Sequence, residues 1–125
     1  MTRLVVATEK IAPAVGPFSA GIISNGVLYS SGQIALDPKT SQLVNGDVTA
    51  QTVQVLINLS FVLQAAGKSL TDVVKTNVYL TDMGDFVAMN AAYAKFFEAP
   101  FPARTTIQAA ALPLGALVEI EIVAQ

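Results

Sequence analysis

The stretch FPARTTIQAAALPLGALVEIEI, residues 101–122, carries the clearest structural signal in the chain. Its last five residues alternate strictly between apolar and acidic side chains, and a period of two is typical of a strand that is buried on one face. We expect Val118, Ile120 and Ile122 to lie under helices. Glu119 and Glu121 then lie on the opposite, helix-free face of the sheet.

Outward from this strand the chain reads as one domain, residues 1–125, with the element order β-β-β-α-β-α-β-β. Asn25-Gly26 predicts a two-residue hairpin turn. Asp47 is a candidate cap for a long helix that Gly67 stops. The region of Asp82 caps a second helix, which Pro100 and Pro102 end and whose inner face carries Phe86, Met89, Asn90, Tyr93 and Phe97. The expected strands cover residues 4–6, 19–23, 27–30 with a continuation to 34 across Gly32, 72–80, 104–109 and 117–123.

Two helices cannot cover both faces of so wide a sheet, so we expect both on one face of an α+β fold. Hydrophobic residues make up 53% of the chain and charged residues only 13%, well below the average of about 25% for soluble proteins. A monomer with so few charges would expose much apolar surface. The composition therefore predicts a homo-oligomer, with the helix-free face either wet or against another subunit.

Several kinds of protein are disfavoured by composition. The net charge is −2 without a basic run, which argues against a nucleic-acid surface, and the chain has neither Cys nor His. The charge-free run 48–67 has the length of a membrane span, but it contains too many amides and hydroxyls for lipid. The N-terminal residues lack the apolar core of a signal peptide. We expect a soluble cytoplasmic protein with no membrane partner and no metal.

Arg104 is the one charged residue between Glu98 and Glu119. Its guanidinium matches a carboxylate bidentately, so it is a candidate clamp for an anionic substrate. The competing interpretation is a structural ion pair with Glu119 or Glu121, or a plain surface arginine. Scarce charge elsewhere in the chain favours the functional interpretation.

Taken together, the motifs of the chain resemble the RidA (YjgF) family of reactive-intermediate deaminases over essentially the whole length. The most specific motif is Phe-Pro-Ala-Arg at 101–104, followed by Ala-Leu-Pro at 111–113 and Ile-Glu-Ile at 120–122. The supporting motifs are Ala-Pro-Ala-Val-Gly-Pro at 12–17 with Ser19, Ser-Gly-Gln-Ile at 31–34, Val-Val-Lys-Thr at 73–76, Phe-Val-Ala-Met-Asn at 86–90 and Tyr-Ala-Lys-Phe-Phe at 93–97.

The resemblance implies a chorismate-mutase-like fold, assembled as a homotrimer with active sites between subunits. It also implies hydrolysis of reactive enamine or imine acids, such as 2-aminoacrylate and 2-iminopropionate, to 2-keto acids and ammonia, without a cofactor. By position, Arg104 would clamp the substrate carboxylate and Glu119 would hold the attacking water. The residues implied to line the pocket are Phe18, Ser31, Gly32, Phe86, Asn90 and Thr106.

Two positions depart from the family pattern. Phe18 stands where a tyrosine is common, and Thr106 stands where a cysteine is frequent. Loss of the phenolic hydroxyl removes one hydrogen bond, worth on the order of 1 kcal/mol, and so bears on rate and substrate preference. Phe18 accordingly favours an alternative, a non-catalytic small-acid-binding or regulatory trimer with a translation-inhibitor or chaperone-like role.

Two further alternatives are weaker. A chorismate mutase needs several cations around a dianion, whereas only Arg104 is well placed. A ribonuclease is disfavoured because the chain has neither a histidine pair nor a basic groove.

Overall fold

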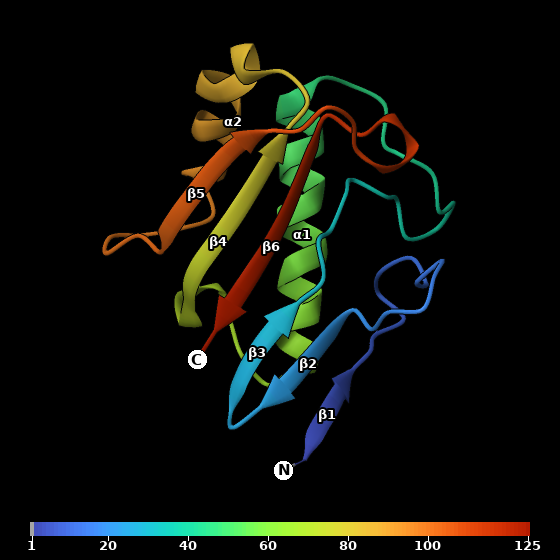
Figure 1. The fold of residues 1–125 in the computed structure, drawn as a ribbon, viewed down its shortest axis with the longest axis vertical. Coiled ribbons are helices and arrows are strands. Elements are labelled where there is room, and N and C mark those ends of the chain that lie inside the picture. Colours follow the sequence, from blue (N-terminus) through green and yellow to red (C-terminus); the bar gives the residue numbers. More distant parts are fainter. Residues whose placement is uncertain (1) are drawn as a thin grey trace.

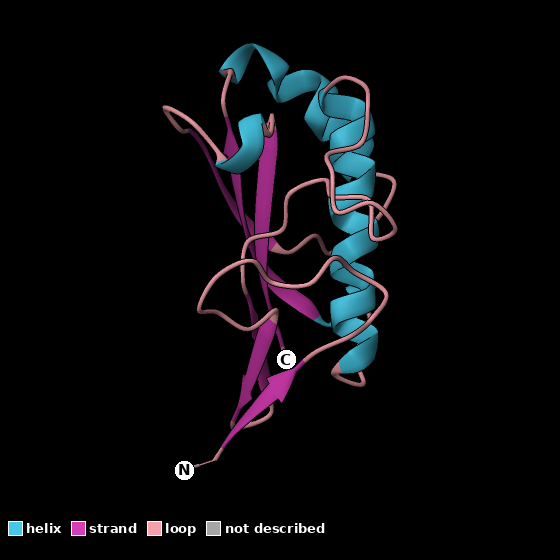
Figure 2. Cartoon of the chain, turned by 90° about the vertical axis from the view of Figure 1, so that its right-hand side faces the viewer, coloured by secondary structure: helices cyan, strands magenta, loops and turns pink. Residues whose placement is uncertain are grey.

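The structure is a computed structural model that describes residues 2–125, and it shows a mixed six-stranded sheet with the helices on one face (Figures 1 and 2). The strand order is β1-β2-β3-β6-β4-β5, in which β4 is antiparallel to β6 and parallel to β5. The strands are β1 (Arg3–Val6), β2 (Gly21–Ser24), β3 (Val27–Ser30), β4 (Val73–Leu80), β5 (Ala103–Gln108) and β6 (Val118–Ala124). The helices are α1 (Val48–Ala65) and α2 (Phe86–Tyr93), with short turns η1 (Leu70–Asp72), η2 (Met83–Asp85) and η3 (Pro113–Gly115).

Local sequence signals set the ends of these elements as expected. Asn25 and Gly26 have φ values of 51° and 76°, so both turn residues of the β2–β3 hairpin are left-handed. The Asp47 side chain accepts a hydrogen bond from the Ala50 amide at 3.1 Å and caps α1. Beyond the other end of α1, Gly67 has a φ of 73°, as the left-handed stop of a helix requires.

The alternation in β6 separates the two faces of the sheet. Val118, Ile120 and Ile122 are at most 2% exposed and belong to the core under the helices, as predicted. Glu119 and Glu121 are half-buried on the face without helices. That face exposes apolar side chains on three different strands, namely Val5, Tyr29 and Ile107.

Helix α1 packs along the sheet (Figure 2). By length and composition it could cross a membrane, but half of it is buried inside the domain, as in the core helix of a soluble protein. Its buried amides hold loops: Gln51 Oε1 accepts from the Leu117 amide at 2.8 Å, and Asn58 Nδ2 donates to the Leu36 carbonyl at 3.0 Å. These polar residues therefore serve the fold, because each satisfies a backbone group of an irregular segment.

Some boundaries differ from those expected. Helix α2 ends at Tyr93, well before the prolines, although Phe97 still packs in the core and stacks on the Tyr93 ring at 4.6 Å. The third strand ends at Ser30, and Gln33 forms only an isolated bridge with Ile120. Between them, the backbone of Gly32 lies beside the Glu119 side chain of β6.

Candidate active site

Arg104 lies on the edge strand β5, directly opposite Thr76 in the parallel ladder. Paired residues in neighbouring strands point to the same face, and Thr76 is fully buried, so the Arg104 side chain points to the helix face. There its Nη2 donates to Asn90 Oδ1 at 2.6 Å. The guanidinium carbon lies 4.8 Å from the ring centroid of Tyr93 and 5.6 Å from that of Phe86.

This geometry excludes the ion-pair interpretation within the chain. The contacts of Arg104 in residues 2–125 are an amide and two aromatic rings, and none is a carboxylate. Glu119 and Glu121 lie on the other face, and β4 separates β6 from β5. Arg104 thus keeps donors that are not committed to any acidic side chain of the described chain.

Thr106 follows Arg104 on the same face of β5, opposite Val78. Its hydroxyl is buried and has no hydrogen-bond partner among residues 2–125. A buried hydroxyl without a partner costs stability, so this one is a donor that a ligand could use. Asn90, Phe86, Tyr93 and Thr106 together with Arg104 form what we call the arginine group.

Glu119 lies on the helix-free face, opposite Tyr79. The backbone of Gly32 passes directly beside its carboxyl group: a Cβ placed on Gly32 would lie 2.8 Å from Glu119 Cδ and would collide with Oε2. A side chain at position 32 would therefore force the flexible carboxylate end of Glu119 to move aside. Mutual backbone hydrogen bonds between Gln33 and Ile120, at 2.9 and 3.1 Å, hold the segment in place.

Ser31 is hydrogen-bonded to the segment that precedes β2. Its amide donates to the Ala20 carbonyl at 2.9 Å and its hydroxyl donates to the Ser19 carbonyl at 2.6 Å. We call Ser31, Gly32 and Glu119 the glutamate group.

Burial raises the pKa of Glu119, and the charge of Glu121 raises it further. Glu121 is itself held by neighbours: Tyr79 Oη donates to it at 2.9 Å, and this bond is the main reason that the pKa of Tyr79 is raised. A carboxyl whose pKa is shifted toward neutrality suits proton transfer to and from a reacting group.

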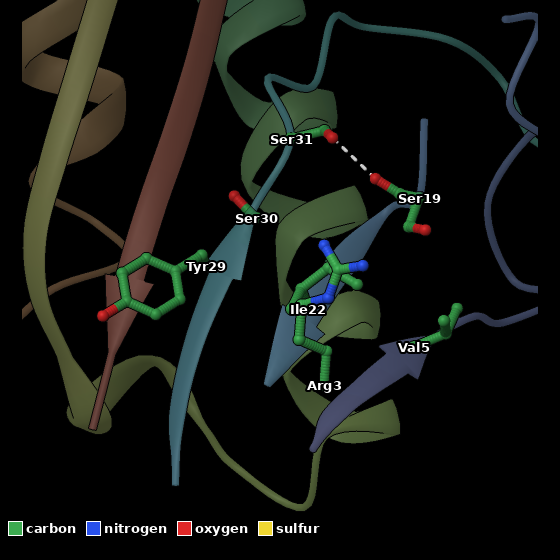
Figure 3. Close-up of a pocket in the computed structure, with 8 residues that line it drawn as sticks. Arg3, Val5, Ser19, Ile22, Tyr29, Ser30 and Ser31 are labelled. Carbon is green, nitrogen blue, oxygen red and sulfur yellow. Dashed lines mark hydrogen bonds between the residues drawn. The ribbon is translucent and has the colours of Figure 1, made fainter. Parts of the chain in front are cut away.

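A hollow of about 420 Å³ adjoins the glutamate group (Figure 3). The side chains around it come from β1, β2, β3 and the segments flanking that hairpin, as Figure 3 shows for Arg3, Tyr29 and Ser31. Phe18, 52% exposed, follows a tight turn in which its amide donates to the Gly16 carbonyl at 2.8 Å. The hollow is lined by Arg3, Val5, Ser19, Gly21, Ile22, Tyr29, Ser30 and Ser31.

Apart from Phe18, the predicted site residues therefore fall into two groups on opposite faces of one sheet. Within one chain Arg104 and Glu119 do not share a cleft, and the expected cleft between subunits stays a prediction. The physical reason is the register, which places Arg104 beside buried Thr76 and Glu119 beside Tyr79 of the alternate set. A site that uses both residues must combine two copies of the chain.

The sequence interpretation missed Tyr93 as part of the arginine group and Thr76 as the hydrogen-bond partner of Tyr93. Tyr93 was assigned only to the inner face of the second helix. Its position one turn beyond Asn90 on α2 is the signal that could have placed it near the same partner. Among residues 2–125, no three acidic side chains gather as they would around a metal ion.

Comparisons with known proteins identify the family of this chain. The sequence model of the family described as Endoribonuclease L-PSP matches residues 8–125. A human protein named 2-iminobutanoate/2-iminopropanoate deaminase is 44% identical over 124 residues, which span 99% of this chain and 90% of that protein. This chain belongs to the RidA family.

Solved RidA-family structures share the whole fold. RidA from the Antarctic bacterium Psychrobacter sp. superimposes with a TM-score of 0.93 at 42% identity, covering 97% of this chain and 98% of the other. TdcF of E. coli, solved with bound serine, has a TM-score of 0.92 at 34% identity, with 97% of each chain covered. The six-stranded sheet with two helices on one face confirms the expected chorismate-mutase-like fold.

Proposed function

We propose that this RidA-family chain is an enzyme, a deaminase that hydrolyses 2-imino acids and their enamine tautomers to 2-keto acids and ammonia. Such substrates arise from pyridoxal-phosphate enzymes, which the activity would protect. The observation that carries the proposal is Arg104, whose guanidinium is oriented by an amide and two rings and has no carboxylate partner among residues 2–125. The human relative's name supports the reaction class.

In this reaction the guanidinium binds the carboxylate of the substrate and fixes the imine carbon next to it. A water held by Glu119 adds to that carbon: the C–O bond forms, the C=N π bond breaks toward nitrogen, and the water proton passes through the carboxylate to the nitrogen, giving the carbinolamine. In its collapse the hydroxyl proton passes through Glu119 to the nitrogen, the C–N bond breaks as C=O forms, and ammonia leaves the keto acid. The raised pKa of Glu119 suits both proton transfers.

The imine carbon is already electrophilic, so the chemistry needs neither a histidine nor a cofactor from the protein. The remaining site residues would complete the pocket. Asn90 and Phe86 hold the arginine, Thr106 offers its free hydroxyl, and Gly32 allows close approach to Glu119.

The active assembly in this proposal is a homotrimer with sites between subunits, in the cytoplasm and without nucleic-acid or membrane partners. The arginine group of one subunit meets the glutamate group of its neighbour. The exposed apolar residues Val5, Tyr29 and Ile107 on the helix-free face support burial of that face against another copy.

The test couples a serine or threonine dehydratase to the purified protein and follows decay of the imine. Wild-type protein in catalytic amounts should accelerate the decay, and Arg104→Ala should not, because it removes the charge-assisted bonds to the substrate. Wild-type protein that leaves the decay rate unchanged would refute the proposal.

A second candidate function is a non-catalytic trimer that binds small acids. The observation that favours it is Phe18, which lacks the hydroxyl of the tyrosine common at this position. Binding of a keto acid that depends on Arg104, without any turnover of imine, would support this function over the first.

A further inference from the structure

A buried hydrogen bond lies directly behind Arg104. Tyr93 on α2 and Thr76 on β4 share it at 2.9 Å between their hydroxyl oxygens. Tyr93 is 5% exposed and Thr76 is 0% exposed, so neither hydroxyl is free to exchange this partner for bulk water. Removing one of these two hydroxyls leaves the other buried without a partner, which costs stability.

The same tyrosine ring faces the guanidinium of Arg104, 4.8 Å from its centroid to the guanidinium carbon. Arg104 is in turn the ladder partner of Thr76. Contacts among these three residues therefore connect α2, β4 and β5 next to the Arg104 guanidinium. Burial raises the pKa of Tyr93, while its hydrogen bond to Thr76 and its interaction with Arg104 lower that pKa.

An arginine side chain has many rotamers, and holding it in one of them lowers the entropy lost when a ligand binds. Asn90 restrains one edge of the guanidinium. The Tyr93 ring, which the bond to Thr76 fixes to the sheet, restrains the face of the guanidinium. The edge turned away from Asn90 then keeps its donors available for an anion.

We propose that Tyr93, locked by Thr76, is a positioning residue that sets the plane of the Arg104 guanidinium for carboxylate binding. The inference rests on the proposed function and adds two residues to it. Tyr93 acts through Arg104 and does not itself touch the reacting atoms. It restrains Arg104 equally in the substrate complex and the transition state, so its loss should raise KM and leave kcat nearly unchanged.

The experiment measures KM and kcat for imine hydrolysis, and separately the dissociation constant of pyruvate, in four variants of the full chain. Tyr93→Leu removes the ring and should raise KM and the pyruvate dissociation constant about tenfold. Tyr93→Phe and Thr76→Val each break the buried hydrogen bond and should raise both constants about threefold. The double variant Thr76→Val/Tyr93→Phe should show the effect of a single one, because both changes break one bond.

The matched control is Thr52→Val. Thr52 is also 0% exposed, but its hydroxyl has no partner among residues 2–125, and it lies on α1. This variant should keep the wild-type KM. A second control places Tyr93→Leu in an Arg104→Ala background, where it should have no further effect on pyruvate binding.

A purely structural role predicts the opposite pattern. A smaller folded fraction lowers the apparent kcat and leaves KM unchanged, and that result in Tyr93→Leu would overturn the inference. If Tyr93→Leu fails to fold, the double variant still decides, because it removes both polar partners and preserves the packing. A double variant with wild-type KM and wild-type pyruvate binding would overturn the inference.

Failure of the proposed function gives a different result. Wild-type protein that binds pyruvate but does not hydrolyse the imine would refute the deaminase activity alone. The pyruvate titration then still decides the role of Tyr93: weaker binding in Tyr93→Leu supports it, and unchanged binding overturns it.

Discussion

Mixing chains that lack Arg104 with chains that lack Glu119 should restore activity that neither variant has alone. The two residues lie on opposite faces of one sheet, with β4 between their strands. A site that contains both must therefore take each from a different copy of the chain. Arg104→Ala and Glu119→Gln would each remove one half of every site in their own homo-oligomer.

The size of the recovery follows from this geometry. In a closed ring formed from equal amounts of the two variants, a given site has an intact arginine in about one half of cases and an intact glutamate in about one half. About one quarter of the sites therefore regain both residues. Loss of a bidentate charge-assisted contact costs about 3–5 kcal/mol, a hundredfold or more in rate, so a recovered quarter stands far above the background.

The assay refolds the two variants together, verifies mixed oligomers by native mass spectrometry, and measures kcat/KM for imine hydrolysis. The control mixes wild-type chains with the double variant Arg104→Ala/Glu119→Gln. That mixture should retain about one quarter of the activity if sites lie between chains, and about one half if each chain builds its own site. Mixed oligomers of the two single variants without any recovery would refute the two-chain site.

Three further predictions test individual parts of the site. Gly32→Ala places a methyl group against the Glu119 carboxyl and should lower kcat/KM about tenfold or more. Tm should change little, because the flexible carboxylate end moves aside. Unchanged kinetics would show that the close packing of Gly32 against Glu119 is unimportant for activity. Glu119→Gln should flatten the pH dependence of stability measured by urea unfolding. The pKa of Glu119 is raised above its ordinary 4.5, so the folded state binds its proton more tightly, and wild-type stability falls as pH rises through the window above 4.5. Glu121→Gln should remove the smaller, charge-derived part of that slope, and a slope that persists in Glu119→Gln would assign it to another group. Phe18→Tyr supplies a phenolic hydroxyl and should raise kcat/KM about fivefold, the equivalent of roughly 1 kcal/mol, whereas Phe18→Leu should not raise it. Equal kinetics in wild type and both variants would mean that the side chain at position 18 does not reach the ligand.

The local features of this chain could be predicted from sequence because each depends on a few neighbouring residues. Asn25 and Gly26 form the expected hairpin turn, and Asp47 caps α1. The alternation in β6 correctly separated the buried from the half-buried face. The end of α2 was misplaced because core packing of Phe97 continues beyond the helix, and apolar spacing does not distinguish the two.

The sequence by itself determined that Arg104 stands alone as a cation and that Glu119 lies on the face without helices. Only the tertiary structure decided where Arg104 points, because that depends on its parallel register with Thr76, a residue 28 positions earlier. The same register turned Arg104 to the helix face, where Tyr93 of α2 lies against the guanidinium, and away from Glu119. Pairing between distant strands is set by the packing of the whole core, and no short stretch of sequence specifies it.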